Sequence, residues 1–201
     1  IGLILQTLGD HKEALHYLIL AKENTADTTS EYASILDAIG TSYLKTNDLK
    51  NANWYFEKTA KLSKEINDEI HYSKALGNLA LVLQKKGDFS SAIPLIEKDI
   101  ATSEKLKNDP NTIFASIKLA TLYLEINQLN MADQLLLKAK KIATSKSLFM
   151  NSELEIIKIQ LKILEKNPSP VNELALRKRI TLLENLLGEK KYNSEILNAN
   201  W

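Results

Sequence analysis

Two histidines near the start of the chain are the first residues whose type suggests chemistry. His11 and His16 lie in the segment His-Lys-Glu-Ala-Leu-His. The zinc-binding motif of metalloproteases places two histidines four residues apart, so that both project from one face of a helix. Here the separation is five residues, which puts the two side chains about 140° apart around a helix. We therefore interpret both as helix-surface residues and expect no metal site.

Other arrangements that carry chemistry are also missing from the sequence. His71 stands alone, and the chain has no cysteine, Gly-rich phosphate loop or nucleophile elbow. The carboxylates are scattered along amphipathic segments, and no pair of them is marked out as acid and base. We expect no catalytic residue and no cofactor, and we predict that the chain is not an enzyme.

The charge pattern argues against nucleic-acid and membrane partners. The formal net charge is +1, and only two of the 26 basic residues, Arg177 and Arg179, are arginine. Nucleic-acid binding favours a concentrated basic face that is rich in arginine. One basic run stands out, formed by Lys138, Lys140, Lys141 and Lys146. It is interpreted either as a solvated helix face or as a surface for an acidic or phosphorylated partner, and the salt dependence of binding would separate the two.

The cellular location of the chain stays open at this stage. A chain without cysteine is compatible with the cytoplasm and equally with an oxidising compartment. No apolar run approaches the ~18 residues of a membrane span. Because the sequence starts at Ile1, already inside a helical pattern, we expect it to be a fragment of a longer protein.

A short turn is repeated along the chain. An apolar helical run ends in Lys85-Lys86-Gly87, and Asp88 follows as a candidate N-cap for the next helix. The same pattern recurs at intervals of 38, 40, 40 and 40 residues; the turns are Gly9-Asp10, Asn47-Asp48, Gly87-Asp88, Asn127-Gln128 and, more loosely, Asn167-Pro168. This spacing predicts a stack of helical hairpins.

Small and bulky residues follow each turn at constant offsets. An alanine comes five residues after each of the first four turns, and a bulky apolar residue comes four residues later: Ala14 and Leu18, Ala52 and Phe56, Ala92 and Ile96, Ala132 and Leu136. A small residue also precedes each turn by seven positions: Gly2, Gly40, Ala80 and Ala120. Together these residues predict one packing ridge on each second helix and a small partner surface on each first helix.

With these features the chain resembles the tetratricopeptide repeat family. The resemblance rests on the pairs Ile39-Gly40, Leu79-Ala80 and Leu119-Ala120 and on the Gly/Asn-Asp turns. It also rests on the aromatic residue or leucine three positions after each pair: Tyr43, Leu83 and Tyr123. It covers residues 1–147 well and 148–190 poorly. It implies an all-α, right-handed superhelical solenoid of about five antiparallel hairpins. The period of about 40 residues, against the usual 34, indicates the long-repeat type.

The periodicity also predicts element and repeat boundaries. Later helices are expected at about 30–46, 48–66, 69–86, 88–107, 110–126, 129–146, 148–165 and 171–187. Asp109 is expected to cap the helix that starts at Pro110. Gly188 is expected to end the helix 171–187, and Ser194 to start a further short helix. The predicted units are a partial first repeat (1–27), three repeats (28–67, 68–107, 108–147), a divergent fifth repeat (148–190) and a capping helix or further repeat (191–201).

In this family the first helices line the surface on which peptides lie, so the resemblance implies a binding groove. The candidate peptide-binding residues are Asp37, Thr41, Lys45, Lys74, Asn78, Leu81, Lys85, Lys118 and Thr121. We rank Asn78 first among them, because an amide can bond a peptide backbone through both its donor and its acceptor. An ordinary surface asparagine is the alternative interpretation.

Two functions of different classes follow. The first is a protein-interaction scaffold that binds a peptide or protein segment in the groove. The alternative is the sensory or regulatory region of a bacterial signalling protein, a histidine kinase or transcription regulator, whose output domain lies outside these residues. The Lys/Asn/Ile-rich, Arg-poor composition mildly favours the second, and the full-length reading frame would decide.

The last repeats carry apolar residues on their predicted groove face. These are Phe114, Ile117, Leu154, Ile157 and Leu161. Large exposed apolar patches usually mark contact surfaces, so a peptide, a second copy in a homodimer or the chain's own end must cover them. We expect the segment 171–201 to fold over them, because it is next in sequence.

Overall fold

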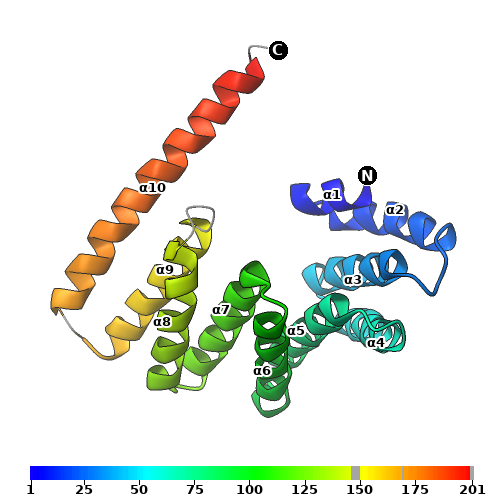
Figure 1. Ribbon diagram of the computed structural model, residues 1–201, viewed down its shortest axis with the longest axis horizontal. Helices are drawn as coiled ribbons and strands as arrows, with labels where there is room; N and C mark the ends of the chain where they lie inside the picture. The colour runs from blue at the N-terminus through cyan, green and yellow to red at the C-terminus, as the bar shows by residue number, and fades with distance from the viewer. Residues whose placement is uncertain (146–149, 169, 200–201) are drawn as a thin grey trace. The chain divides into compact units, whose positions relative to one another are not determined.

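The described residues of this computed structural model are all helical apart from their turns and links (Figure 1). The structure describes residues 1–145, 150–168 and 170–199, except for the side chains of 170–171 and 189–199. The helices are α1 (Gly2–Leu8), α2 (His11–Glu23), α3 (Ser30–Lys45), α4 (Leu49–Glu65), α5 (Glu69–Lys85), α6 (Phe89–Lys105), α7 (Asp109–Glu125), α8 (Leu129–Ser145), α9 (Met150–Lys166) and α10 (Pro170–Ala199). The predicted all-α class is confirmed.

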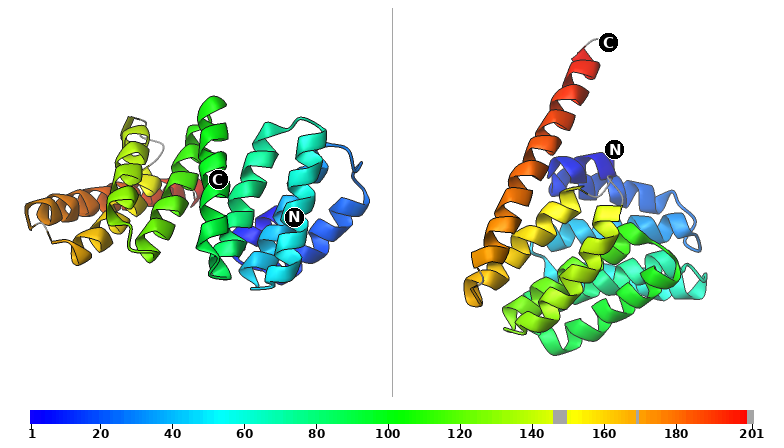
Figure 2. Two further views of the ribbon diagram at one scale, coloured as in Figure 1. Left: turned by 90° about the horizontal axis from the view of Figure 1, so that it is seen from below. Right: turned by 60° about the vertical axis from the view of Figure 1, so that its left-hand side comes forward.

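The chain forms two compact units. The first, Ile1–Asn111, stacks the hairpins α1–α2, α3–α4 and α5–α6, with α2 packed on α3 and α4 packed on α5 (Figure 2). The second, Thr112–Trp201, contains most of α7 together with α8, α9 and α10, and α9 packs against both α8 and α10. Within the first unit each helix packs against its neighbours in sequence, as expected for a repeat stack.

Four of the five predicted turns are confirmed as left-handed turns, and Asn167 is not left-handed. The backbone at Gly9, Asn47, Gly87 and Asn127 is left-handed, with φ of 86°, 63°, 79° and 62°. The amide of the residue after each of these four donates a hydrogen bond to a carbonyl in the last turn of the preceding helix. For example, the Asp48 N–H donates to the Tyr43 carbonyl at 2.8 Å. Glycine and asparagine tolerate this conformation best. The side chains of Asp10, Asp48 and Asp88 then accept from the amide three residues on, as N-caps do.

The same turn also joins one hairpin to the next, which the sequence pattern did not indicate. Asn67 and Lys107 have φ of 58° and 53°, and the amides of Asp68 and Asn108 bond back to Ser63 and Ser103 at 2.7 and 2.9 Å. The N-cap before α7 is Asn108, whose Oδ1 accepts from the Asn111 amide at 3.3 Å. The expectation that Asp109 is the cap was wrong by one residue, because α7 already begins at Asp109.

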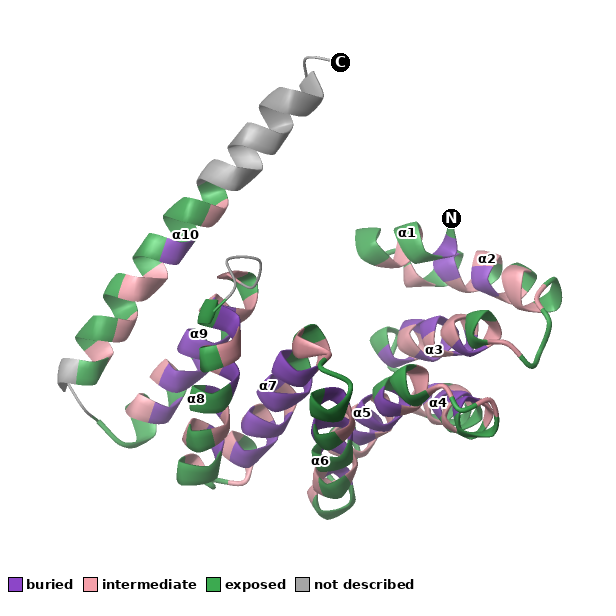
Figure 3. Ribbon diagram, viewed as in Figure 1, coloured by how far each residue is buried: buried purple, intermediate pink, exposed green. Residues whose placement is uncertain are grey.

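The predicted packing ridge forms the core of the hairpins. Ala14, Ala52, Ala92 and Ala132 are fully buried, and Leu18, Phe56, Ile96 and Leu136 are at most 4% exposed. Phe56 packs against Leu44 of its own hairpin and Val82 of the next. A methyl group added at Gly40 would lie 2.7 Å from Cε1 of Phe56, so this position has no room for a side chain. Figure 3 shows the resulting buried faces between the helices.

The C-terminal segment differs from the expectation. The sequence pattern predicted a helix that ends at Gly188 and a separate short helix starting near Ser194, whereas α10 is one helix from Pro170 to Ala199. A glycine inside a helix costs only about 1 kcal/mol, so Gly188 alone does not stop it. The predicted end at Trp201 lies outside the described residues.

Candidate functional site: the row of first helices

The first helices of the N-terminal unit form one row, held by polar contacts. On α1, the Gln6 Nε2 amide donates to the Ala38 carbonyl at 2.6 Å and to Ser42 Oγ at 2.7 Å, both on α3. On α5, the Asn78 Nδ2 amide donates to Asp37 Oδ1 on α3 at 2.7 Å. The structure thus brings α1, α3 and α5 side by side, as the resemblance implied for a groove.

Two of the predicted groove residues, Asp37 and Asn78, contact each other directly. One amide function of Asn78 is therefore committed to holding α5 against α3, in addition to any role in binding. Both residues are half-buried. This contact gives Asn78 a structural role that the sequence did not indicate, because residues 41 positions apart become neighbours only through hairpin packing.

The remaining groove candidates of this unit surround that pair. Lys45, Lys74 and Lys85 are exposed, while Thr41 and Leu81 are half-buried. On α5 the spacing of Lys74, Leu81 and Lys85 keeps them on one helical stripe. These candidates include three exposed lysines and one carboxylate, that of Asp37. The row can therefore offer charge, hydrogen bonds and a modest apolar contact to a peptide laid across it.

Lys118 and Thr121 lie on α7 in the second unit. The Lys118 Nζ lies 4.3 Å from the ring centroid of Phe114, and the Thr121 hydroxyl donates to the Ile117 carbonyl of its own helix at 2.9 Å. Phe114 is 53% exposed, whereas Ile117 and Ile157 are buried. The expectation that the C-terminal segment covers Phe114 was therefore wrong, because α10 packs on α9 instead.

The structure also places the residues considered for chemistry. His71 Nδ1 lies 2.6 Å from Oδ2 of Asp68, the N-cap of α5. The His16 ring meets the Tyr17 ring edge-on at 5.4 Å. Within the described part of the chain, no group of three histidine or acidic side chains is placed to hold a metal ion, and no helix is long and apolar enough to cross a membrane. Of the basic run, Lys141 is exposed and Lys146 lies outside the described residues.

A buried polar cluster is a feature that the sequence reasoning missed. Asp99 on α6 is 1% exposed, and its Oδ1 accepts from the Ser73 hydroxyl and, at 2.7 Å, from the Asn111 amide. Asn111 also contacts Ser103 Oγ at 2.6 Å. The positions equivalent to Asp99 in the neighbouring hairpins hold Thr59 and Ala139, both buried. A carboxylate at a position otherwise occupied by small residues was the signal that could have found this cluster.

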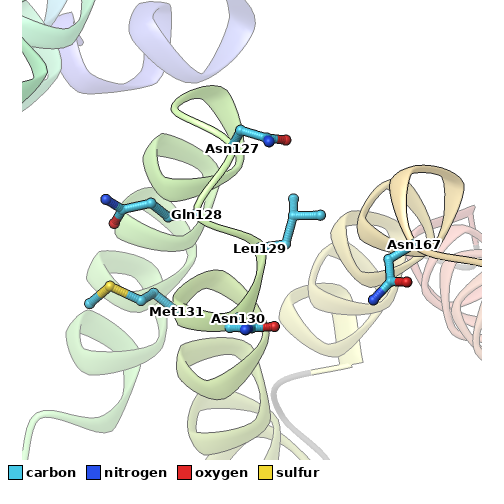
Figure 4. A pocket seen from close by; sticks show the side chains of 6 residues that line it. All are labelled: Asn127, Gln128, Leu129, Asn130, Met131 and Asn167. Carbon is cyan, nitrogen blue, oxygen red and sulfur yellow. The ribbon is translucent and has the colours of Figure 1, made fainter.

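The second unit has an amide-lined hollow of about 420 Å³ at the α7–α8 turn (Figure 4). Asn130 and Asn167 project into it from opposite sides, with Leu129 between them. It continues into a hollow of about 500 Å³ between α8, α9 and the start of α10, which shares Leu129, Asn130 and Asn167 with the first. The amides can form hydrogen bonds with a peptide and the leucines can pack against it, but these side chains supply no acid, base or nucleophile.

The comparisons with known proteins agree with this architecture. Residues 72–145 match the family model described as Tetratricopeptide repeat. The chain is 31% identical over 150 residues to Protein KINESIN LIGHT CHAIN-RELATED 3 of Arabidopsis thaliana, covering 70% of this chain and 23% of the relative. It is 26% identical over 129 residues to Tetratricopeptide repeat protein 29 of Macaca fascicularis, covering 62% and 27%. This chain therefore spans about a quarter of each curated relative.

Among solved structures, the crystal structure of BtubC (BKLC) from P. vanneervenii is similar in fold. It superposes with a TM-score of 0.78 over 93% of this chain and 78% of that one, at 14% sequence identity. At this identity the likeness concerns the fold alone.

Proposed function

Because the chain carries tetratricopeptide repeats, we propose that it is a protein-interaction scaffold whose N-terminal unit binds an extended peptide or protein segment along α1, α3 and α5. The observation that carries this proposal is the row itself. Gln6 and the Asp37–Asn78 pair hold three helices side by side, while Thr41, Leu81 and three lysines remain accessible along them. The proposed site residues of this unit are Asp37, Thr41, Lys45, Lys74, Asn78, Leu81 and Lys85. The candidates Lys118 and Thr121 lie on α7 in the second unit and are proposed separately as contacts of that unit.

The chemistry of these residues favours binding over catalysis. Amide, hydroxyl and ammonium groups on rigid helices present donors and acceptors to a peptide backbone and to acidic side chains. Families built from such repeats are typically non-enzymatic, and we propose the same for this chain.

The test is a selection followed by a steric block. Peptides would be selected from a random phage-displayed library on the intact chain, and their affinities measured for Thr41→Trp, which places a bulky group in the row. Lys64→Trp, at an exposed position of α4, is the matched control. We expect Thr41→Trp to weaken the selected peptides at least tenfold and Lys64→Trp to leave them unchanged. Peptides indifferent to Thr41→Trp would contradict a site on this row.

The alternative proposal, a regulatory region of a bacterial signalling protein, rests on the Lys/Asn/Ile-rich, Arg-poor composition. A regulatory region would also bind a peptide or protein. It differs from the scaffold in having an output domain attached to the repeats. Sequencing the full reading frame decides between the two: a kinase domain, membrane helix or DNA-binding domain supports the regulatory role, and a chain made of repeats alone supports the scaffold.

A further inference from the structure

The N-terminal unit also has a hollow that none of the groove candidates lines. It has a volume of about 230 Å³ and lies between α2, the start of α3 and α4. Its lining combines the aromatic and apolar residues Tyr32, Leu36, Trp54, Tyr55 and Leu62 with the charged residues Lys22, Asp27, Lys58, Lys61 and Glu65. None of the groove candidates lines it, so it can act independently of the proposed peptide site.

Trp54 is not needed at its position by the fold. It is 49% exposed, and the equivalent positions after the other turns hold His16, Pro94 and Gln134, all exposed. Trp54 meets the Tyr55 ring edge-on at 4.7 Å, and Tyr55 in turn stacks on Tyr43 at 5.6 Å. Burial raises the pKa of Tyr55. An exposed tryptophan supported by a packed tyrosine pair is a rigid aromatic surface of the kind that anchors protein partners.

The next hairpin shows the same positions in a closed arrangement. There Tyr72 and Lys98 stand where α3 and α4 have Tyr32 and Lys58. Lys98 Nζ donates to the Tyr72 hydroxyl at 2.9 Å and lies 5.0 Å from its ring centroid. Lys58 instead lies 5.1 Å from the Trp54 ring centroid, and among the described residues it makes no hydrogen bond to Tyr32, which also lines the hollow. The α3–α4 hairpin therefore lacks the lysine–tyrosine contact that links the two helices of the α5–α6 hairpin.

The charges around the hollow indicate the chemistry of its occupant. Three lysines face two carboxylates, and the Lys61 ammonium is 3.9 Å from Glu65. When that pair is set aside, the lining has two ammonium groups, Lys22 and Lys58, and one carboxylate, Asp27. Neither lysine forms an ion pair with another described residue. The ammonium beside the exposed Trp54 ring is thus available to an anion that arrives with an apolar group.

We propose that this hollow binds an apolar side chain, flanked by acidic residues, from a partner protein. The apolar side chain lies against Trp54, Tyr55 and Tyr32, and the flanking carboxylates accept hydrogen bonds from Lys58 and Lys22. A volume of about 230 Å³ suits one leucine or phenylalanine side chain with part of its backbone.

The probe is a fluorescein-labelled hexapeptide, Glu-Asp-Leu-Phe-Asp-Glu, whose binding to the intact chain is followed by fluorescence anisotropy. We expect Trp54→Ala and Lys58→Ala each to weaken binding at least fivefold. Lys98→Ala, the equivalent change in the next hairpin, should leave it unchanged, and so should the groove block Thr41→Trp. In a Trp201→Phe background Trp54 is the only tryptophan, and its emission should shift as the peptide saturates the site.

Three results would overturn the proposal. One is equal binding of the charge-reversed peptide Lys-Lys-Leu-Phe-Lys-Lys or of Glu-Asp-Ser-Gly-Asp-Glu, which lacks the apolar anchor. Another is wild-type binding by both Trp54→Ala and Lys58→Ala. The third is loss of binding in Thr41→Trp, which would assign the peptide to the row of first helices. Circular dichroism of each variant confirms folding, which the exposure of both side chains favours.

Discussion

The α3–α4 hairpin and the α9–α10 hairpin differ in how their two helices are joined and held together. In the first, a single left-handed residue, Asn47, makes the turn, and Phe56 packs into the space left by Gly40. In the second, Pro168 lies in the link and α10 begins at Pro170. The Arg179 Nε and Nη2 donate to the two oxygens of the buried Glu153 at 2.9 and 3.0 Å.

This difference shows that an ion pair can take over part of the role that complementary side-chain shapes have in the other hairpin. The interface between α9 and α10 buries Leu183 completely and adds a Lys158–Glu184 ion pair at 3.1 Å. Hydrogen bonds from Arg179 to Glu153 raise the pKa of the guanidinium, and partial burial opposes them. A hairpin held by small and bulky residues should be insensitive to salt, whereas one held by a half-exposed arginine should respond to it.

The largest expected effect comes from breaking the shape-based hairpin. Phe56→Ala removes a side chain that is 0% exposed, and the loss of transfer energy together with the cavity should cost ~3–5 kcal/mol. Urea denaturation followed by circular dichroism measures it. The cost should be the same at low and high salt, and a strongly salt-dependent cost would contradict the assignment of this hairpin to packing.

The next effect concerns the charge-based hairpin. Arg179→Ala leaves Glu153, which is 3% exposed, buried without its fork of donors, and should cost roughly 2 kcal/mol because Arg179 itself is partly solvated. The matched variant Arg179→Ala/Glu153→Met removes both charges and should recover most of the loss. If the double variant is as unstable as the single one, the ion pair does not hold α10 on α9.

A smaller effect is expected at the Asp68 cap. Burial raises the pKa of Asp68, but hydrogen bonds from the His71 amide and the Ser30 hydroxyl outweigh it and leave the pKa below its ordinary value of 3.8. The folded state therefore gains stability from ionised Asp68 at neutral pH, and this gain is lost as pH falls through and below 3.8.

Asp68→Ala should accordingly cost about 1 kcal/mol at pH 7. The difference from the unsubstituted chain should shrink as the pH is lowered below the ordinary carboxyl range. Asp68→Asn, which keeps an N-cap oxygen without the charge, is the control and should show a smaller loss. A pH-independent cost for Asp68→Ala would mean that the cap acts without its charge.

The smallest effect is a gain at the turn between α6 and α7. Lys107 holds a left-handed backbone with φ of 53° and is exposed, a conformation that costs an ordinary residue roughly 1–2 kcal/mol. Lys107→Gly should remove that cost and lose part of the gain to unfolded-chain entropy. A net stabilisation of about 0.5 kcal/mol is expected in urea denaturation. The same change at Lys64, which is exposed and lies in the helical backbone of α4, should not stabilise.

Features that depend on a few consecutive residues could be read directly from the sequence. The turns at Gly9, Asn47, Gly87 and Asn127 follow from the backbone freedom of glycine and asparagine, and the N-caps from the aspartates beside them. The alanine ridge was visible because a 40-residue period repeats the same close approach of two helices. Local conformational preference and spacing therefore determined the class of fold, the hairpins and the faces that pack.

Only the tertiary structure decided which distant side chains meet. The Asp37–Asn78 bond, the buried Asp99 cluster and the fork of Arg179 on Glu153 each join residues from different helices. The contrast between the open Trp54 hollow and the closed Tyr72–Lys98 contact depends on side-chain directions across hairpins. Burial and partner choice are set by packing between elements, and no pattern within one element contains that information.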